Sequence, residues 1–472
     1  MYLGDSLLLT LNHYRYDLYR GDLPVHMFLS NHFNKYCKDI SMAASEENPF
    51  VGKEFISKLG LALPLLSDFS DCLVGLSEAY RNGQGKRAYD EAYCLLERMS
   101  PYFLQRFQWK GSNEQFIRIR NGDYRITDGK VSKEQKAQMF HIKNDLRHKI
   151  GAYRYSVSGY PCLYLSSGEE LAWFECGMPK QFSYCRMLIT EEGENALRLV
   201  DFSNTPADII SSIHVWLLGA RKNGQKDQED KIYNYLLNYI LTYPLAAACS
   251  MRAKQRNNKF VEEYVIPQMF MQWIRESDEF DGVRYKSSLY TNLVEGMGAV
   301  NIALPVKAFR PDGLCKKLTS SILVSDIGYF DVNKDFEKYS SHLHEIERFM
   351  DVLWSDILNE EDQGSYVWQL IEVCETVLRT YNALMEGNYL NGELLFNHID
   401  RLHDYIHCIY RSKTIIVDDC LKKAQSENTL HSFDEDKINS HIDKFYKLMS
   451  EVVRKHTVFN FRFDDLDNFE NI

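Results

Sequence analysis

The spacing of hydrophobic residues changes twice along the chain, and this change constrains the fold more than any other feature. From about residue 24 to residue 107 the apolar residues recur at helical spacing, as they do between Phe55 and Leu66. Short β-branched or aromatic runs then alternate with helical patterns, before long amphipathic helical patterns return. We therefore expect an α+β protein with a central sheet. The expected parts are a helical N-terminal region (1–112), a central domain (113–310) and a helical C-terminal region (311–472).

Local patterns give the expected elements more closely. The expected strands are 115–119, 162–165, 184–189, 197–202, 282–285 and 302–308. The expected helices of the central domain are 171–176, 209–218, 231–248 and 260–276, and those of the C-terminal region are 336–354, 367–385, 390–410 and 438–456. A turn is expected at 82–85, a helix end at Ser100-Pro101, and an exposed polar loop at 222–230.

Composition excludes several classes of protein. The 472 residues carry a net charge of −11, which argues against a protein that binds nucleic acid through its phosphate backbone. The 11 cysteines include no C-x-x-C pair, and His141 and His148 do not have the spacing of a helical metal site, so we expect no metal. No uninterrupted apolar run reaches the ~18 residues of a membrane helix, and residues 1–10 lack a basic, cleavable signal pattern. A cytoplasmic protein without a membrane partner is expected.

Polar residues of three types gather between residues 116 and 175. Arg118 and Arg120 fall on one face of an expected strand, where two guanidiniums need an anion or carboxylates to offset their repulsion. Tyr164 alternates with two leucines that would face the core, so it would look into a cleft. Glu175 falls in the last turn of a short expected helix, where a carboxylate opposes the helix dipole. Surface ion pairs and packing would explain each residue alone, but the set together suggests an active site.

The order and spacing of four segments resemble the RES domain, a toxin family named for its Arg, Glu and Ser. The segments are 116–120, 154–166, 171–175 and 280–287. The resemblance covers about residues 113–310 and implies a fold similar to that of ADP-ribosyltransferases and an activity that destroys NAD. The family's R-[WF]-N pattern reads Arg154-Tyr155-Ser156 here, with Ser in place of Asn.

The resemblance also implies roles for individual residues. Arg118 and Arg154 would hold phosphates, Tyr164 would shape the nicotinamide end, and Glu175 would stabilise an oxocarbenium-like state as the nicotinamide–ribose bond breaks. Ser287 matches the family's serine and would bind ribose or an acceptor. Further substrate contacts are assigned to Arg120, Tyr155 and Ser288, the last being a register alternative to Ser287.

NAD would be a substrate and not a cofactor, because neither G-x-G-x-x-G nor G-x-x-x-x-G-K-[ST] is present. The acceptor stays open between water, inorganic phosphate and a protein side chain, so an ADP-ribosyltransferase that modifies a protein target is an alternative. A second alternative is a HEPN-like ribonuclease that uses Arg401 and His407, and a third is a non-enzymatic binding scaffold. A NAD-destroying enzyme needs restraint, so a cognate antitoxin in a toxin–antitoxin or anti-phage setting, or an oligomer formed through the helical regions, is expected.

Overall fold

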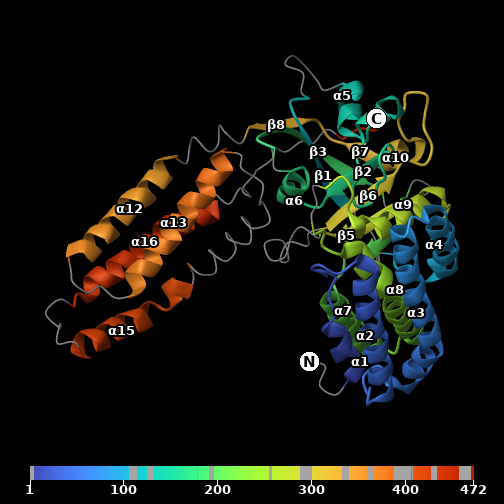
Figure 1. The fold of residues 1–472 in the computed structure, drawn as a ribbon, viewed down its shortest axis with the longest axis horizontal. Coiled ribbons are helices and arrows are strands. Elements are labelled where there is room, and N and C mark those ends of the chain that lie inside the picture. The colour runs from blue at the N-terminus through green and yellow to red at the C-terminus, as the bar shows by residue number, and fades with distance from the viewer. Residues whose placement is uncertain are drawn as a thin grey trace.

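The computed structural model shows a mixed α+β protein with helical N- and C-terminal regions around one sheet (Figure 1). It describes residues 5–16, 18–105, 114–124, 132–177, 179–190, 196–254, 258–287, 300–331, 340–359, 365–386, 406, 408–426, 433–455 and 469–472. The predicted fold class, α+β with helical flanks, is confirmed.

Four helices form the N-terminal region, and their ends follow local signals. They are α1 (Ser6–Asn12), α2 (Val25–Ser45), α3 (Gly52–Arg81) and α4 (Gly85–Met99), followed by the 3-10 turn η1 (Ser100–Tyr102). The predicted turn separates α3 from α4, and Gly83 adopts a φ of 78° there, which glycine tolerates without steric cost. The predicted helix end at Ser100-Pro101 is also confirmed.

Three helices of the central region pack against these four and share one hydrophobic core with them. They are α7 (Pro206–Lys222), α8 (Lys226–Ser250) and α9 (Val265–Glu276), the last preceded by the turn η3 (Glu262–Tyr264). The predicted exposed loop at 222–230 is wrong in extent, because most of its charged residues form the first turns of α8. Among the described helices, α3 is long and apolar enough to cross a membrane by length and composition alone, and a core helix of a soluble protein passes the same test.

Eight strands form one sheet in the order β4-β5-β6-β2-β1-β3-β7, with β8 also paired to β3. They are β1 (Glu114–Asn121), β2 (Cys162–Ser166), β3 (Gln181–Ile189), β4 (Leu199–Phe202), β5 (Gly282–Lys286), β6 (Val300–Pro305), β7 (Ile322–Val324) and β8 (Gly328–Asp331). Among the strands that the structure describes, only β4 and β5 pair in parallel. Each strand predicted before residue 310 is present, whereas β7 and β8 lie in the region that was predicted to be helical.

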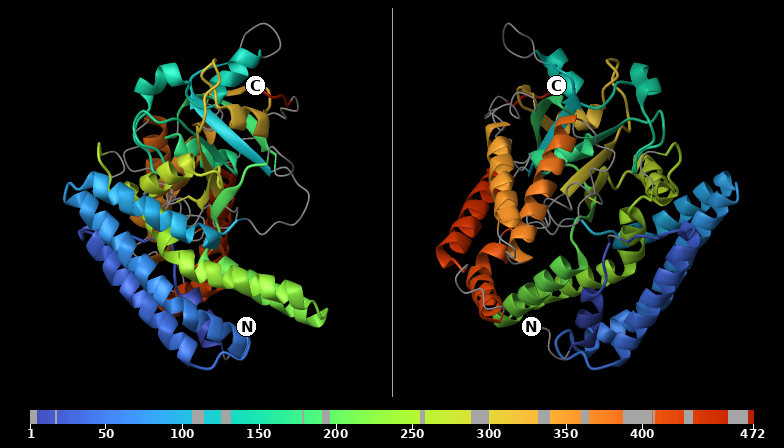
Figure 2. Two further views of the ribbon diagram at one scale, coloured as in Figure 1. Left: turned by 90° about the vertical axis from the view of Figure 1, so that its right-hand side faces the viewer. Right: turned by 60° about the vertical axis from the view of Figure 1, so that its left-hand side comes forward.

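Alternation along the strands directs their side chains to two covered faces. Leu163 and Leu165 pack in a core with α5 (Lys133–Met139) and α10 (Lys316–Ser321), as the pattern of β2 predicted. Tyr164 faces the opposite side, against the helical core that contains α7 to α9. In both views of Figure 2 the N-terminal helices, in blue, lie to one side of the sheet and extend below it.

The C-terminal region contains α12 (Ser340–Asn359), α13 (Ser365–Glu386), α15 (Lys413–Ser426) and α16 (Glu435–Lys455). α15 was not predicted, and most of the helix predicted at 390–410 lies outside the described residues. Residues of these helices share a hydrophobic cluster with Ile117 and Ile119 of β1. The chain then returns to the sheet: Val324 and Glu470 exchange two backbone hydrogen bonds, and Arg310 donates to the carbonyl of Ile472 at 3.2 Å.

Candidate active site

A cavity of about 650 Å³ lies beside β1 and β2, where these two neighbouring strands stop pairing. Among the described residues β1 pairs with β2 only at Ile117 and Ser166, although it pairs with β3 along its whole length. Side chains use two of the carbonyls that a longer ladder would have occupied: Arg118 donates to the Tyr164 carbonyl at 2.8 Å, and the Cys176 thiol lies 3.7 Å from the Ile119 carbonyl. The split in the sheet therefore exposes polar groups to a ligand-sized space.

Five of the residues that were predicted to form the site line this cavity. They are Arg118, Arg120, Arg154, Tyr164 and Glu175.

The carboxylate of Glu175 is held by two donors from strands that are distant in sequence. Glu175 is the last residue of α6 (Glu169–Glu175), as predicted. Its Oε1 accepts hydrogen bonds from the Ser287 hydroxyl and from the Asn301 side-chain amide, both at 2.7 Å. Asn301 is fixed in turn by the Ser166 hydroxyl, which donates to its Oδ1 at 2.7 Å. These donors offset the unfavourable place of a carboxylate at a helix C-terminus.

Of the two donors to Glu175, the sequence predicted Ser287 but not Asn301. Ser287 was predicted through its match to the family's serine, and the structure brings it to Glu175. Asn301 was missed, although it interrupts the apolar run of β6 and is 2% exposed. A buried amide in an apolar strand needs a polar partner, and that requirement is the signal that could have identified it.

Arg118 presents a cation to the cavity, and none of the described carboxylates forms an ion pair with it. Its NH1 donates to the Tyr164 carbonyl, while its buried Nε has no hydrogen-bond partner in the described part of the chain. Burial, and then the nearby Arg120, lowers the pKa of the Arg118 guanidinium from its ordinary value, although an arginine stays charged at neutral pH. A buried, uncompensated guanidinium is stabilised when an anion enters the cavity.

Arg120 lies on the same face of β1 and reaches the cavity rim. It donates to the Gln138 carbonyl, and its guanidinium lies 5.0 Å from the centre of the Tyr124 ring, in cation–π geometry. Arg118 and Arg120 thus share a face of the strand as the alternation predicted.

Tyr164 projects from β2 into the cavity, and its hydroxyl donates to the Ser156 hydroxyl at 3.0 Å. Burial raises the pKa of Tyr164 well above its ordinary value, so the phenol stays neutral. Ser156 stands where the family pattern has Asn, and the structure gives it a place: it orients the tyrosine. Cys162 also lines the cavity, but burial raises the pKa of its thiol to about 12, so it is not poised as a thiolate nucleophile.

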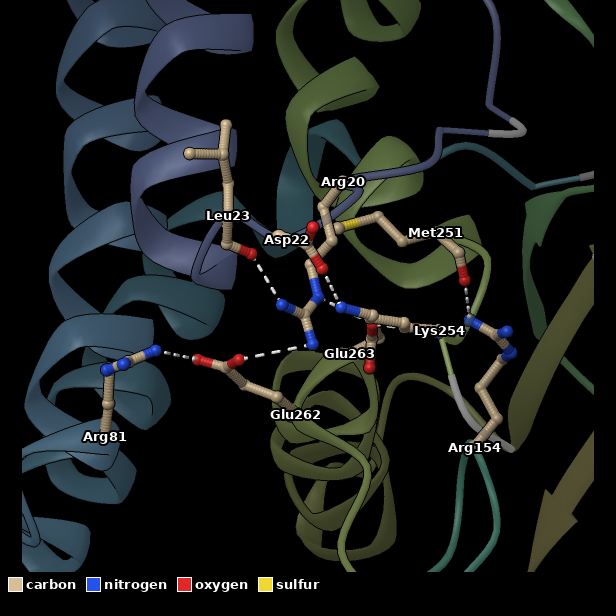
Figure 3. A network of polar contacts seen from close by, with 9 residues as sticks. All are labelled: Arg20, Asp22, Leu23, Arg81, Arg154, Met251, Lys254, Glu262 and Glu263. Carbon is tan, nitrogen blue, oxygen red and sulfur yellow. Dashed lines mark hydrogen bonds and ion pairs between the residues drawn. The ribbon is translucent and has the colours of Figure 1, made fainter. Parts of the chain in front are cut away.

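Arg154 also lines the cavity. Its NH1 donates to the carbonyls of Cys249 at 3.0 Å and Met251 at 2.8 Å, and its guanidinium lies 4.9 Å from the centre of the Tyr264 ring. Figure 3 shows Arg154 directed at Met251. The neighbouring Tyr155 is fully buried in the helical core, with its ring 4.7 Å from that of Tyr285, and it does not line the cavity. The structure therefore gives Tyr155 a packing place behind the site and does not support its predicted contact with substrate.

Ser288, Arg401 and His407 lie outside the described residues, so the register alternative and the ribonuclease pair stay predictions. His141 is buried: its Nδ1 lies 2.9 Å from the Ile142 carbonyl and its Nε2 accepts from the Cys315 backbone N–H at 2.8 Å. Both ring nitrogens of His141 thus make hydrogen bonds within the fold.

Comparison with known proteins gives a partial match. A protein of Bacillus subtilis (strain 168) named "Putative toxin YopC" is 30% identical over 214 residues, which are 44% of this chain and 46% of that protein. The match therefore spans about half the length of the relative. No family model and no solved structure matches, so the resemblance to the RES domain stays a prediction. The chain is similar, over less than half its length, to a protein that is named as a toxin.

Proposed function

We propose that this protein is a toxin-type enzyme that cleaves the nicotinamide–ribose bond of NAD. The observation that carries the proposal is the Glu175 carboxylate, which two side-chain donors hold at one cavity with the buried guanidinium of Arg118. An anionic carboxylate stabilises positive charge that develops on a sugar, and a guanidinium binds phosphate oxygens. NAD carries both groups in one molecule.

The proposed reaction is balanced in bonds, charge and electrons without a cofactor. The glycosidic bond breaks and its electron pair leaves with nicotinamide, which becomes a neutral base. The ribosyl carbon gains oxocarbenium character, and Glu175 stabilises that charge. Water or inorganic phosphate then adds to the same carbon, giving ADP-ribose and a released proton in the first case and a phosphorylated ADP-ribose in the second. Whichever acceptor is used, no electron is transferred to or from the protein.

Arg118 offers a hydrogen-bond donor to a phosphate-bearing ligand. Like Arg120 and Arg154 it donates to a backbone carbonyl, but its buried Nε has no protein partner among the described residues. The cavity volume of about 650 Å³ falls within the ~300–1,000 Å³ that is typical of ligand pockets. The pyrophosphate of NAD, or an attacking phosphate ion, would offset the buried charge.

Similarity to a protein named as a toxin favours a setting in which NAD loss harms the cell. We propose a cytoplasmic toxin–antitoxin or anti-phage role, with a cognate antitoxin protein or self-association through the helical regions as the restraint. Modification of a protein target with ADP-ribose is the alternative reaction of the same site.

The test is nicotinamide release from NAD by the purified protein and by Glu175→Gln, with and without inorganic phosphate. We expect release that falls at least 100-fold in Glu175→Gln, since the variant keeps the shape of the side chain but loses its charge. Glu91→Gln is the matched control, because Glu91 is a surface carboxylate in an ion pair with Arg87 on α4. Equal release by the wild type and Glu175→Gln would refute the assignment. Transfer of label from NAD to protein, without free ADP-ribose, would favour the alternative reaction.

A further inference from the structure

One wall of the cavity is built by two short stretches of the connection between α8 and α9. One stretch directly follows α8 and the other directly precedes α9. We define the Arg154 wall as residues 251–254 and 262–264. Arg252, Ala253 and Tyr264 line the cavity directly. Arg154 donates to the Met251 carbonyl and lies over the Tyr264 ring, so its position depends on this wall.

The N-terminal region supplies the contacts that hold the wall. Residues 18–23 belong to the connection between α1 and α2, and Figure 3 shows Arg20 and Asp22 of this stretch beside Glu263 and Lys254 of the wall. The backbone N–H of Arg252 donates to the Leu18 carbonyl at 2.8 Å. Arg20 donates from Nε to Glu263 at 2.7 Å, and its NH2 lies 3.5 Å from Glu262. We call residues 18–23 the N-terminal arm.

Three further contacts reinforce the Arg154 wall and its attachment to the N-terminal region. Glu263 also accepts from the backbone N–H of Lys254 at 3.1 Å, so one carboxylate oxygen joins both stretches of the wall to Arg20. The Lys254 ammonium pairs with Asp22 of the arm and lowers the pKa of that carboxyl. Arg81, at the end of α3, lies 3.2 Å from Glu262.

The Arg20–Glu263 pair is buried, which sets it apart from ordinary surface ion pairs. The side chains of Arg20 and Glu263 are 13% and 2% exposed, respectively. Removal of one member of a buried pair leaves an uncompensated charge, which is far more costly than loss of an exposed pair. The wall should therefore shift or loosen when Arg20 is removed, because Glu263 must then find water.

We propose that Arg20 and Glu263 are positioning residues that set the place of Arg154 and thereby the affinity of the cavity for its phosphate-bearing ligand. The proposal rests on the proposed function, in which Arg154 holds a phosphate. It makes the N-terminal arm a part of the active site, although the arm lies outside the segment that resembles the RES domain.

The experiment compares the full-length wild type with Arg20→Met, Arg20→Lys and Arg87→Met. Methionine keeps the apolar stem and removes the charge, whereas lysine keeps the charge but cannot engage two carboxylates in a fork. Arg87 is the matched control because it pairs with Glu91 on the exposed face of α4. Two quantities are measured: hydrogen exchange of the amides of residues 251–254, and the dissociation constant for ADP-ribose, which lacks the bond to be cleaved.

In Arg20→Met we expect hydrogen exchange of the Arg252 and Lys254 amides to become about tenfold faster or more, and the affinity for ADP-ribose to fall about tenfold. Arg20→Lys should give intermediate values of both quantities, and Arg87→Met should change neither. Unchanged exchange in Arg20→Met would overturn the positioning role, whatever the activity. Faster exchange with unchanged ADP-ribose affinity would overturn the link between the arm and the ligand. A wild type that neither binds ADP-ribose nor cleaves NAD would refute the proposed function and this link with it, while exchange would still report on how the wall is held.

Discussion

Replacement of Asn301 by leucine tests whether the Glu175 carboxylate works only when it is held in place. Asn301→Leu keeps the number and branching of the side-chain heavy atoms but removes the amide that donates to Glu175 Oε1 at 2.7 Å. A hydrogen bond to a charged group contributes about 1.5–3 kcal/mol. If that contribution is expressed in the transition state, kcat falls about 10- to 150-fold, at about 1.36 kcal/mol per factor of ten.

The substitution also removes the acceptor of the buried Ser166 hydroxyl, so stability should fall by about 1–3 kcal/mol. The thermal midpoint must therefore be measured alongside kcat at saturating NAD, at a temperature where both proteins are folded. Ser287→Ala removes the second donor to the same oxygen and serves as the parallel variant.

A double-mutant cycle with Glu175→Ala gives the decisive result. Asn301 acts through Glu175, so Asn301→Leu should reduce kcat less than twofold once the carboxylate is absent. A full 10-fold or greater loss in the Glu175→Ala background would show that Asn301 acts on the substrate directly and would refute the reasoning. A loss below about threefold in the wild-type background would show that the hydrogen bond does not matter for the reaction.

Three further outcomes follow from other parts of the molecule. Arg118→Met should leave the stability of the ligand-free protein unchanged or higher, because it removes a buried charge, but it should weaken ADP-ribose binding about tenfold or more. A thermal melt measures the stability, and a calorimetric titration measures the binding. Burial lowers the pKa of His141 from 6.5 to about 4, so the stability that goes with the neutral ring is fully present above pH 6.5 and is lost as pH falls toward 4. The loss amounts to about 2 kcal/mol at pH 5. Denaturant titrations should therefore show a smaller difference in unfolding free energy between pH 7 and pH 5 for His141→Gln than for the wild type. Gly282→Ala should destabilise the protein by about 1–3 kcal/mol, because the new Cβ would lie 2.5 Å from the Ala303 carbonyl oxygen. Gly60→Ala, in an open part of α3, should stabilise it by about 0.5–1 kcal/mol. Equal shifts of the thermal midpoint in the same direction would contradict the packing argument.

Sequence patterns predicted the elements that carry their own local signal. The turn between α3 and α4 contains Gly83 and is followed directly by Gly85, and the strand at Cys162–Ser166 alternates leucines with polar residues, so both were identified correctly. The charged start of α8 was mistaken for a loop because a solvent-facing helix turn and a loop have the same composition. β7 and β8 have 3 and 4 residues, respectively, and they are strands because they pair with β3, which no local pattern reveals.

Part of the site was predictable because some of its residues also lie in segments with a local sequence signal. Arg118, Tyr164 and Glu175 lie close together in sequence, where alternation and helix position already indicate how each is directed. Asn301 is 126 positions from Glu175, and Arg20 is 243 positions from Glu263. Contacts across such separations depend on strand order and helix packing, so residues that hold the site from a distance are the ones that sequence reasoning missed.

The return of the chain to β7 has a consequence during synthesis. Arg310 and the Ile472 carbonyl are 162 positions apart, and the backbone groups of Val324 that meet Glu470 belong to the same late contact. At about 5–20 residues per second, the ribosome needs on the order of 10 to 30 s to deliver the second partner after the first. During that interval the edge at β7 is an unpaired strand that can recruit another nascent chain. Folding yield should therefore depend on translation speed through the C-terminal helices, although none of the described residues of these helices lines the cavity.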